Sequence, residues 1–351
     1  MKDFSNVLKN FGFPEDSTMI PWGNGHINDT FRVNDEYLLQ RINTNVFKDP
    51  KGLMNNIYLV TDFLSKRIVA AGGDPKRETL TIVKTVDGEL FFTDDDGKAY
   101  RMYLFIDNTL SLDKVEEKED FYSCGFGFGD FQRQLGEFDA SLLTETIVNF
   151  HNTLARFETF EKAIADNKSG RRDLVQAEID FALARKGLVE DIMDRYSRLP
   201  LRVTHNDTKL NNVLFDEKTR KPLCVIDLDT VMPGKAANDF GDAVRFGAST
   251  AAEDETDLSK VHFDIELYRA FAQGFLAGCG NVLGEEERIS LAYGCILMTF
   301  ECGMRFLTDH LEGDTYFKIH RENHNLDRCR TQFKLVSEME QQLDKMIEIV
   351  K

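Results

Sequence analysis

The pattern of apolar and polar residues changes character near Asp107. Between Ile20 and Ile106, short runs rich in β-branched and aromatic residues alternate with turn signals such as Asp87-Gly88, which predicts strands. The expected strands are Thr30 to Val33, Tyr37 to Ile42, Leu80 to Thr85, Leu90 to Thr93 and Ala99 to Ile106. Helices are predicted at Ser5 to Asn10 and at Asn55 to Ala70, the latter apolar every third or fourth residue. Residues 1–106 should therefore form a small antiparallel-sheet lobe.

After Asp107 the apolar period lengthens to three or four residues, which predicts a mostly helical lobe over residues 107–351. The expected helices are Lys118 to Glu137, Glu145 to Lys162, Leu174 to Tyr196, Ile265 to Ala277, Glu285 to Leu311 and Arg328 to Ile349. Two short strands, Arg202 to His205 and Leu223 to Asp227, interrupt them. We expect a two-lobed α+β protein whose ligand lies at the interface of the lobes, where clefts are common.

The two interrupting strands carry the clearest chemical signal. The first leads into Val203 to Asn212, which contains the pattern H-x-D-x-x-x-x-N, and the second ends at Asp227. This layout is typical of a kinase catalytic loop followed by a metal-binding aspartate. The alternative is an Asx-rich turn between buried strands. A second motif at kinase-like distance favours the active site over this alternative.

Each polar residue of these motifs has a role in that interpretation. Asp207 would deprotonate an alcohol, and Lys209 would offset charge on the transferred phosphoryl group. The candidate magnesium ligands are Asn212, Asp227 and Asp229, because magnesium on phosphates prefers oxygen ligands. The sequence therefore predicts phosphoryl transfer from a metal-bound nucleotide.

Glycines suggest a second part of the nucleotide site. In Gly23-Asn24-Gly25-His26, glycines would let backbone amides approach a phosphate; an ordinary G-x-G hairpin is the alternative. The run from Gly125 to Gly129 lies inside a predicted helix and indicates close helix packing instead. Asp239 and Asp242 are expected to cap a helix. A Walker-type P-loop pattern is absent from the sequence.

The composition of the chain argues against some classes of binding partner. The 351 residues carry a formal net charge of -17, which argues against nucleic acid binding. The six cysteines form no C-x-x-C pair and indicate reduced, mostly buried thiols. Neither a signal peptide nor an apolar run long enough to span a bilayer is visible. We expect a cytoplasmic, monomeric enzyme without membrane partners.

Two residues near the C-terminus are candidates for contact with an acceptor. Arg305 lies among apolar residues of a predicted helix, where a guanidinium needs a carboxylate or a ligand oxygen. An internal ion pair with Glu301, four residues earlier, is the alternative. Tyr316 could stack on an acceptor or simply pack.

The chain resembles the aminoglycoside phosphotransferase and choline kinase group, whose fold is like that of protein kinases. Within that group it is similar to the N-acetylhexosamine 1-kinases of bacteria. The segments that carry the likeness are Gly23 to Asn28, Leu39 to Thr44, Gly129 to Gln132, Val203 to Leu214, Ile226 to Thr230, Arg245 to Thr250 and Glu301 to Leu307. They extend over nearly the whole chain.

The resemblance implies transfer of the ATP γ-phosphoryl group to the anomeric hydroxyl of N-acetylglucosamine or N-acetylgalactosamine, with magnesium as cofactor. The sugar contacts that it implies are His26, Asn43, Arg305 and Tyr316. The hinge residues that it implies next to adenine are Tyr103, Phe105 and Ile106. Other alcohols, such as choline or an aminoglycoside, are alternative acceptors, and a non-catalytic nucleotide-binding protein is the alternative from another class.

The chain departs from the kinase pattern at the residues that normally pair with the nucleotide phosphates. The sheet-lobe lysine that pairs with them appears as Gln40, while the adjacent Arg41 points to the opposite face of the strand. The inserted helix offers Asn55, Asn56 and Tyr58 where a partner glutamate is expected. The usual Lys–Glu ion pair is therefore missing from the sequence.

Overall fold

The computed structural model describes residues 4–23 and 28–351, which form two compact units. The sheet unit consists of Met1–Leu112, Gln134–Val148 and Asn211–Pro233. The helical unit consists of Asp113–Arg133, Asn149–Leu210 and Gly234–Lys351. Each unit has its own core and is described by itself.

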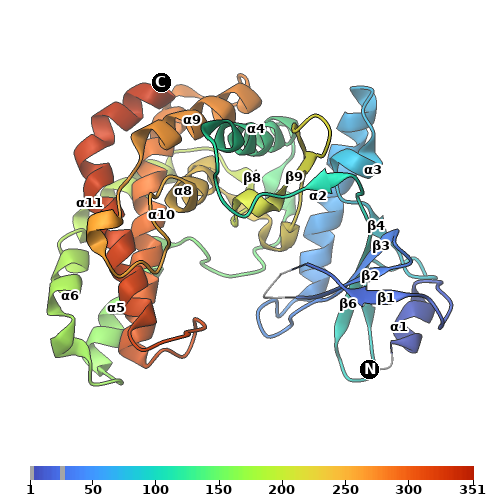
Figure 1. Ribbon diagram of the computed structural model, residues 1–351, viewed down its shortest axis with the longest axis horizontal. Coiled ribbons are helices and arrows are strands. Elements are labelled where there is room, and N and C mark those ends of the chain that lie inside the picture. Colours follow the sequence, from blue (N-terminus) through green and yellow to red (C-terminus); the bar gives the residue numbers. More distant parts are fainter. Residues whose placement is uncertain (1–3, 24–27) are drawn as a thin grey trace. The chain divides into compact units, whose positions relative to one another are not determined.

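The sheet unit is built on an antiparallel sheet with the order β1-β2-β3-β6-β4, to which β5 adds by pairing with β6 (Figure 1). Its strands are β1 Met19–Pro21, β2 Asp29–Val33, β3 Tyr37–Arg41, β4 Ile82–Val83, β5 Phe92–Thr93 and β6 Ala99–Leu104. The five predicted strands are confirmed, although β4 and β5 are only two residues long. The short strand β1 was not predicted.

The two faces of this sheet differ in chemistry. Helix α1, Ser5–Asn10, packs Val7 and Leu8 with Leu39 and Met102 in one hydrophobic cluster. Residues next to these in the strands point the opposite way, because side chains alternate along a strand. Gln40 therefore lies on the other face, which is polar.

Three helices and a three-stranded hairpin sheet complete the sheet unit. Their bounds are α2 Pro50–Ala70, α3 Pro75–Glu78, β7 Thr109–Leu110, β9 Val213–Asp216 and β10 Pro222–Val225, with α1 given above. Helix α2 begins earlier than expected, because Asp49 caps it by accepting from the Gly52 amide and Pro50 suits its first turn. The side chain of Asn56, inside α2, donates to the carbonyls of Thr144 and Val231.

Helices dominate the second unit, and α10 and α11 lie side by side in it (Figure 1). Its main elements are α4 Lys118–Gln134, α5 Thr153–Asp166, α6 Gln176–Leu183, α7 Lys186–Ser197, β8 Arg202–Thr204, α8 Ala236–Gly247, α9 Ile265–Cys279, α10 Glu285–Glu312 and α11 His324–Val350. The short elements of the whole chain are η1 Ala140–Leu142, η2 Arg172–Leu174, η3 Leu210–Asn212, η4 Leu228–Thr230, η5 Leu258–Lys260 and β11 Met232–Gly234.

Two predicted helices of the helical unit differ clearly from the structure. The predicted helix from Glu145 starts only at Thr153, where Asn152 accepts from the Ala155 amide as an N-cap. The predicted helix from Leu174 to Tyr196 is divided into α6 and α7. Apolar periodicity alone did not reveal the start of α5, because a local capping contact sets it, whereas neither α6 nor α7 begins with a side-chain cap.

Glycines let α4 and α9 approach backbone to backbone. A Cβ at Gly125 or Gly129 would overlap main-chain atoms of α9, and one at Gly274 or Gly278 would overlap main-chain atoms of α4. The prediction that the Gly125 to Gly129 run serves helix packing is confirmed.

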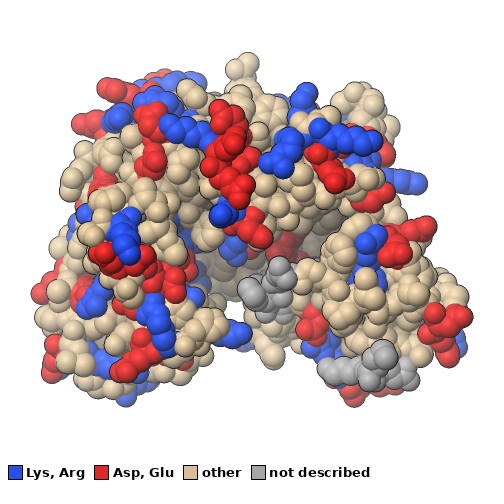
Figure 2. Space-filling model, viewed as in Figure 1, with Lys and Arg blue, Asp and Glu red and all other residues tan. Residues whose placement is uncertain are grey.

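Surface charge and cysteines agree with an ordinary folded domain. Acidic and basic side chains are interspersed over the face drawn in Figure 2. All six cysteines are free, and all but Cys302 are buried. No helix within residues 4–23 and 28–351 is both long and apolar enough to cross a bilayer.

Candidate active site

The loop after β8 is held by two aspartates of helix α8. The backbone amides of His205 and Asn206 donate to the Asp239 carboxylate at 2.9 and 2.7 Å. The Thr208 amide donates to Asp242 at 3.1 Å. Asp239 and Asp242 lie inside α8, whose N-cap is Lys235, so the prediction that they cap the helix is wrong. Their carboxylates instead fix the backbone of the H-x-D loop.

The buried surroundings of Asp239 make it a firm anchor. Gln132 of α4 also donates to this carboxylate, at 3.2 Å, and to the carbonyl of Val203. Burial raises the pKa of Asp239, against the effect of the loop amides that bond its charged form. The His205 ring is fully buried and meets Phe128 edge-on at 5.6 Å. The loop is therefore pinned from α4 and α8.

Asp207, the predicted base, projects from this pinned loop. Its carboxylate is 2.8 Å from the Lys209 ammonium, and the Lys209 amide donates to the Asp207 carbonyl at 3.0 Å. Burial lowers the pKa of Lys209, but the Asp207 carboxylate outweighs this effect and the pKa is raised. Lys209 therefore stays a cation directly beside the predicted base.

Two predicted magnesium ligands lie at the open end of one hairpin in the sheet unit. Strands β9 and β10 pair Val213 with Val225, and the Ile226 amide donates to the Asn212 carbonyl at 2.9 Å. Asp227 is the next residue, exposed and in a left-handed conformation with φ 58°. Asn212 and Asp227 offer oxygen ligands of the kind that magnesium takes together with water and phosphate. The hairpin thus fits the predicted role, which remains a prediction.

Asp229, the third predicted magnesium ligand, is buried and held on both sides of its carboxylate. One oxygen is 2.5 Å from the Arg101 guanidinium, and the other accepts from the Asn28 side chain at 2.7 Å. The Asn28 side chain also accepts from the Asn43 amide at 2.9 Å. Gln40, predicted to contact the nucleotide, accepts from Arg101 at 2.9 Å.

Part of the backbone of the predicted hinge already makes hydrogen bonds within the protein. The Phe105 amide donates to the Glu36 carbonyl at 2.7 Å, and the Ile106 carbonyl accepts from Thr109 at 3.1 Å. Tyr103 is buried, and burial raises its pKa. The Phe105 ring lies 4.2 Å from the Arg32 guanidinium. Contact of this segment with adenine remains a prediction.

Arg305 and Tyr316 are brought together in the helical unit. The Arg305 guanidinium is 6.0 Å from the Tyr316 ring and 5.5 Å from the Phe317 ring. Among residues 4–23 and 28–351, it makes no hydrogen bond or ion pair. Glu301 uses its carboxylate elsewhere, accepting from Thr153 at 2.7 Å with the His151 ring 3.1 Å away. The alternative of an Arg305–Glu301 ion pair is therefore wrong.

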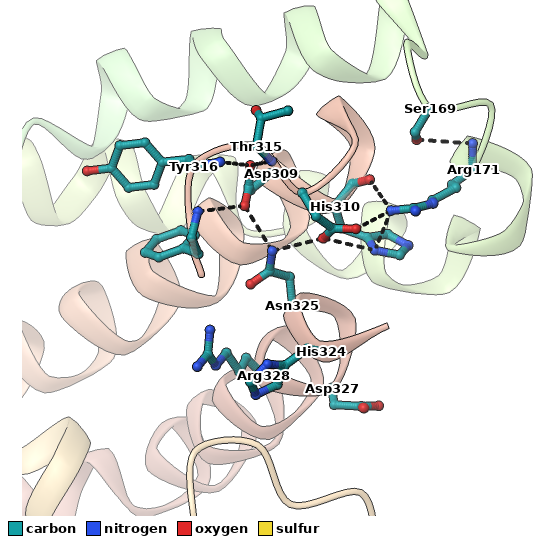
Figure 3. A network of polar contacts seen from close by, with 12 residues as sticks. Ser169, Arg171, Asp309, His310, Thr315, Tyr316, His324, Asn325, Asp327 and Arg328 are labelled. Carbon is teal, nitrogen blue, oxygen red and sulfur yellow. Dashed lines mark hydrogen bonds and ion pairs between the residues drawn. The ribbon is translucent and has the colours of Figure 1, made fainter. Parts of the chain in front are cut away.

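A polar network holds the loop that carries Tyr316 (Figure 3). The Asp309 carboxylate, near the end of α10, accepts from the backbone amides of Thr315, Tyr316 and Phe317 at 2.8 to 2.9 Å. It also accepts from the Asn325 side chain at 2.8 Å. Tyr316 is 72% exposed, so its backbone is held in place by these hydrogen bonds rather than by burial.

Other arginines of the site were missed by the sequence argument. Arg156 of α5 is near Arg305, and burial together with this second cation lowers its pKa. Its Nε is buried without a hydrogen-bond partner among the described residues. A charged residue inside the apolar strand Ala99–Leu104 was the signal that could have indicated Arg101. Of the predicted residues, Asn24, Gly25 and His26 lie outside the described residues, while Gly23 is described with φ 74°.

A cavity of about 400 Å³ adjoins the catalytic loop within the helical unit. Leu210, Arg245, Glu253 and Gln332 contribute to its lining. Arg245 is already paired with Asp242 and with Glu253 at 2.8 Å. The cavity thus shares Arg245 with the network that fixes the catalytic loop.

Solved structures that resemble this chain include several kinases and phosphotransferases. The microcompartment-associated aminopropanol kinase matches with a TM-score of 0.68 at 14% identity, over 97% of each chain. A choline/ethanolamine kinase family protein from Mesorhizobium loti gives a TM-score of 0.57 at 14% identity, over 95% of this chain and 92% of that one. An ADP-bound aminoglycoside phosphotransferase gives 0.56 at 14% identity, over 96% and 98%. These similarities show an α+β, protein-kinase-like fold.

The structural similarities show the fold, and the sequence identifies the family. Residues 18–275 match the model of the phosphotransferase enzyme family (APH), and the chain belongs to this family. The matched range includes the H-x-D loop and Asp227, whose roles remain a prediction.

Proposed function

We propose that this protein is a magnesium- and ATP-dependent kinase that phosphorylates the anomeric hydroxyl of N-acetylhexosamines. In this proposal Asp207 accepts the proton of the acceptor hydroxyl, and Lys209 keeps a positive charge next to it. Asn212 and Asp227 are the residues that would hold magnesium. When bound, magnesium would offset the charge of the nucleotide phosphates.

The choice of acceptor rests on the surroundings of the Arg305 guanidinium. Its guanidinium meets two aromatic rings and makes no hydrogen bond or ion pair with the described part of the chain. Arg156, a second cation, lies near it. Two cations in one region repel a cationic acceptor, whereas hydroxyl and acyl oxygens can accept from them. A neutral, oxygen-rich sugar therefore fits better than choline or an aminoglycoside.

Amino alcohols are the second candidate class. The aminopropanol and choline/ethanolamine kinases share the fold of this chain. If this chain used such an acceptor, the guanidiniums of Arg305 and Arg156, which lie near each other, would repel its positive charge.

An acceptor screen tests the proposal. ATP turnover is measured with N-acetylglucosamine, N-acetylgalactosamine, glucose, choline, aminopropanol and kanamycin, and phosphorus NMR identifies a 1-phosphate or a 6-phosphate. We expect turnover with the N-acetylhexosamines and a 1-phosphate product. Preferred turnover of choline or aminopropanol would refute the choice of acceptor.

Two variants test the residue roles. Asp207→Asn removes the base and should lower kcat by about 100-fold or more while nucleotide binding persists. Arg305→Gln should raise KM for the sugar and leave KM for ATP unchanged. Arg195→Gln is the matched control, since Arg195 also stacks on a ring, 4.7 Å from Tyr293, in the same unit. Normal turnover of Asp207→Asn would contradict its assignment as the base.

A further inference from the structure

Arg101 is a buried charge in the middle of a sheet strand. It is 1% exposed, and its Nη1 lies 2.5 Å from Asp229 Oδ1 as an ion pair. Its Nε donates to Gln40 at 2.9 Å, and Gln40 donates to Thr30 at 3.0 Å. A buried guanidinium is tolerated only when a carboxylate and further hydrogen bonds compensate for the lost water. Neighbouring strands β2, β3 and β6 thus share one polar ladder on one face of the sheet.

The carboxylate end of this ladder reaches the turn that carries Asp227. Asp229 is two residues after Asp227, in η4, and its second oxygen accepts from Asn28. Asn28 also receives the Asn43 amide. One carboxylate therefore connects the start of β2 and the strand β6 to the turn.

The conformation of the turn explains why it needs an anchor. Asp227 has φ 58°, a left-handed backbone that costs free energy for a residue other than glycine. Such a conformation persists only when surrounding contacts hold it. The buried pair on Asp229, two residues further along the chain, joins this turn to strand β6.

We infer that the Arg101–Asp229 ion pair anchors the Asp227 turn to the sheet in a chain that lacks the usual Lys–Glu pair. Arg101 is too buried to reach a phosphate, so it is a positioning residue. Asp229, with both oxygens engaged, is an anchor rather than a magnesium ligand. This inference rests on the proposed function, because it assigns Asp227 to magnesium.

The charges of the pair support this assignment. A guanidinium keeps its charge in proteins, and the Asp229 carboxylate 2.5 Å away supplies the opposite charge inside the sheet unit. Because Arg101 and Asp229 neutralise each other, replacing both by neutral residues removes the anchor without changing the net charge near Asp227.

The double variant Arg101→Met/Asp229→Asn separates anchoring from mere stability. Arg101→Met alone leaves a buried carboxylate unpaired and should lower the midpoint of thermal unfolding. The double variant should recover most of that midpoint. We still expect it to bind a magnesium complex of a non-hydrolysable ATP analogue about 10- to 100-fold more weakly, as measured by calorimetry.

A second ion pair in the same sheet provides the control for the double variant. Arg41 and Asp29 pair across β2 and β3 next to the ladder, and Arg41→Met/Asp29→Asn should leave nucleotide affinity unchanged. Wild-type affinity in the Arg101/Asp229 double variant would overturn the inference. If the unaltered protein itself does not bind the magnesium nucleotide, the proposed function fails instead.

Discussion

Asp239→Asn is the substitution with the clearest expected effect on the catalytic loop. The carboxylate accepts from the amides of His205 and Asn206 and from Gln132, at 2.7 to 3.2 Å. An asparagine keeps one acceptor oxygen and turns an NH₂ group toward the donors that met the other. At least one loop amide then faces a donor instead of an acceptor.

The size of the effect follows from these contacts. Losing one hydrogen bond to a charged acceptor costs about 1.5 to 3 kcal/mol, and a buried amide left without a partner costs a further 1 to 3 kcal/mol, roughly. Relaxation of the loop would reduce that cost by moving the backbone before Asp207. A displacement of about 1 Å in a reacting group can lower turnover about 100-fold. We expect Asp239→Asn to lower both the free energy of unfolding and kcat.

Denaturant unfolding and steady-state turnover of the same preparations measure the two effects. Asp264→Ala is the control, because Asp264 also accepts two backbone amides, as the N-cap of α9, without contacting the catalytic loop. It should cost about 1 kcal/mol of stability and leave kcat unchanged. If Asp239→Asn keeps the kcat of the unaltered enzyme, the loop does not depend on this carboxylate and the reasoning is refuted.

Three further predictions concern packing, pH and the acceptor loop. Gly129→Ala should destabilise the protein by about 1 to 3 kcal/mol in urea unfolding because its Cβ would overlap the backbone of α9, whereas Gly187→Ala, with open space around it, should be neutral or stabilising; equal effects would contradict the packing argument. Burial lowers the pKa of His310 below 6.5, so the unfolded chain binds the proton first and stability should fall as pH drops below about 6.5; His310→Gln should flatten this slope in unfolding measured between pH 7 and 5, and an unchanged slope would assign it to other groups. Asp309→Asn should release the Tyr316 loop and raise the acceptor KM while KM for ATP stays constant; parallel changes in both constants would show a general loss of structure.

Local periodicity was enough for most elements. Strands β2, β3 and β6 and helices α9 to α11 follow the predicted segments closely, because residues typical of each element recur in it at the expected spacing. The prediction failed where a contact distant in sequence or a capping side chain set the boundary, as at Thr153 of α5. Strand β1 is three residues long, too short for alternation to distinguish it from a loop.

The amino-acid sequence alone supported the catalytic motif, since the identity and spacing of Asp207, Asn212 and Asp227 are properties of neighbouring residues. The sequence could not predict which side chains contact one another across the fold. Asn28 and Asp229 are 201 residues apart, and only folding brings them within 2.7 Å. The same holds for Arg305, which forms no ion pair with the part of the chain that the structure describes, because the Glu301 carboxylate contacts Thr153 and His151 instead. The sequence gives the identity of each side chain directly. Burial and pairing decide what that side chain can do, and both arise from packing between segments that are distant in the sequence.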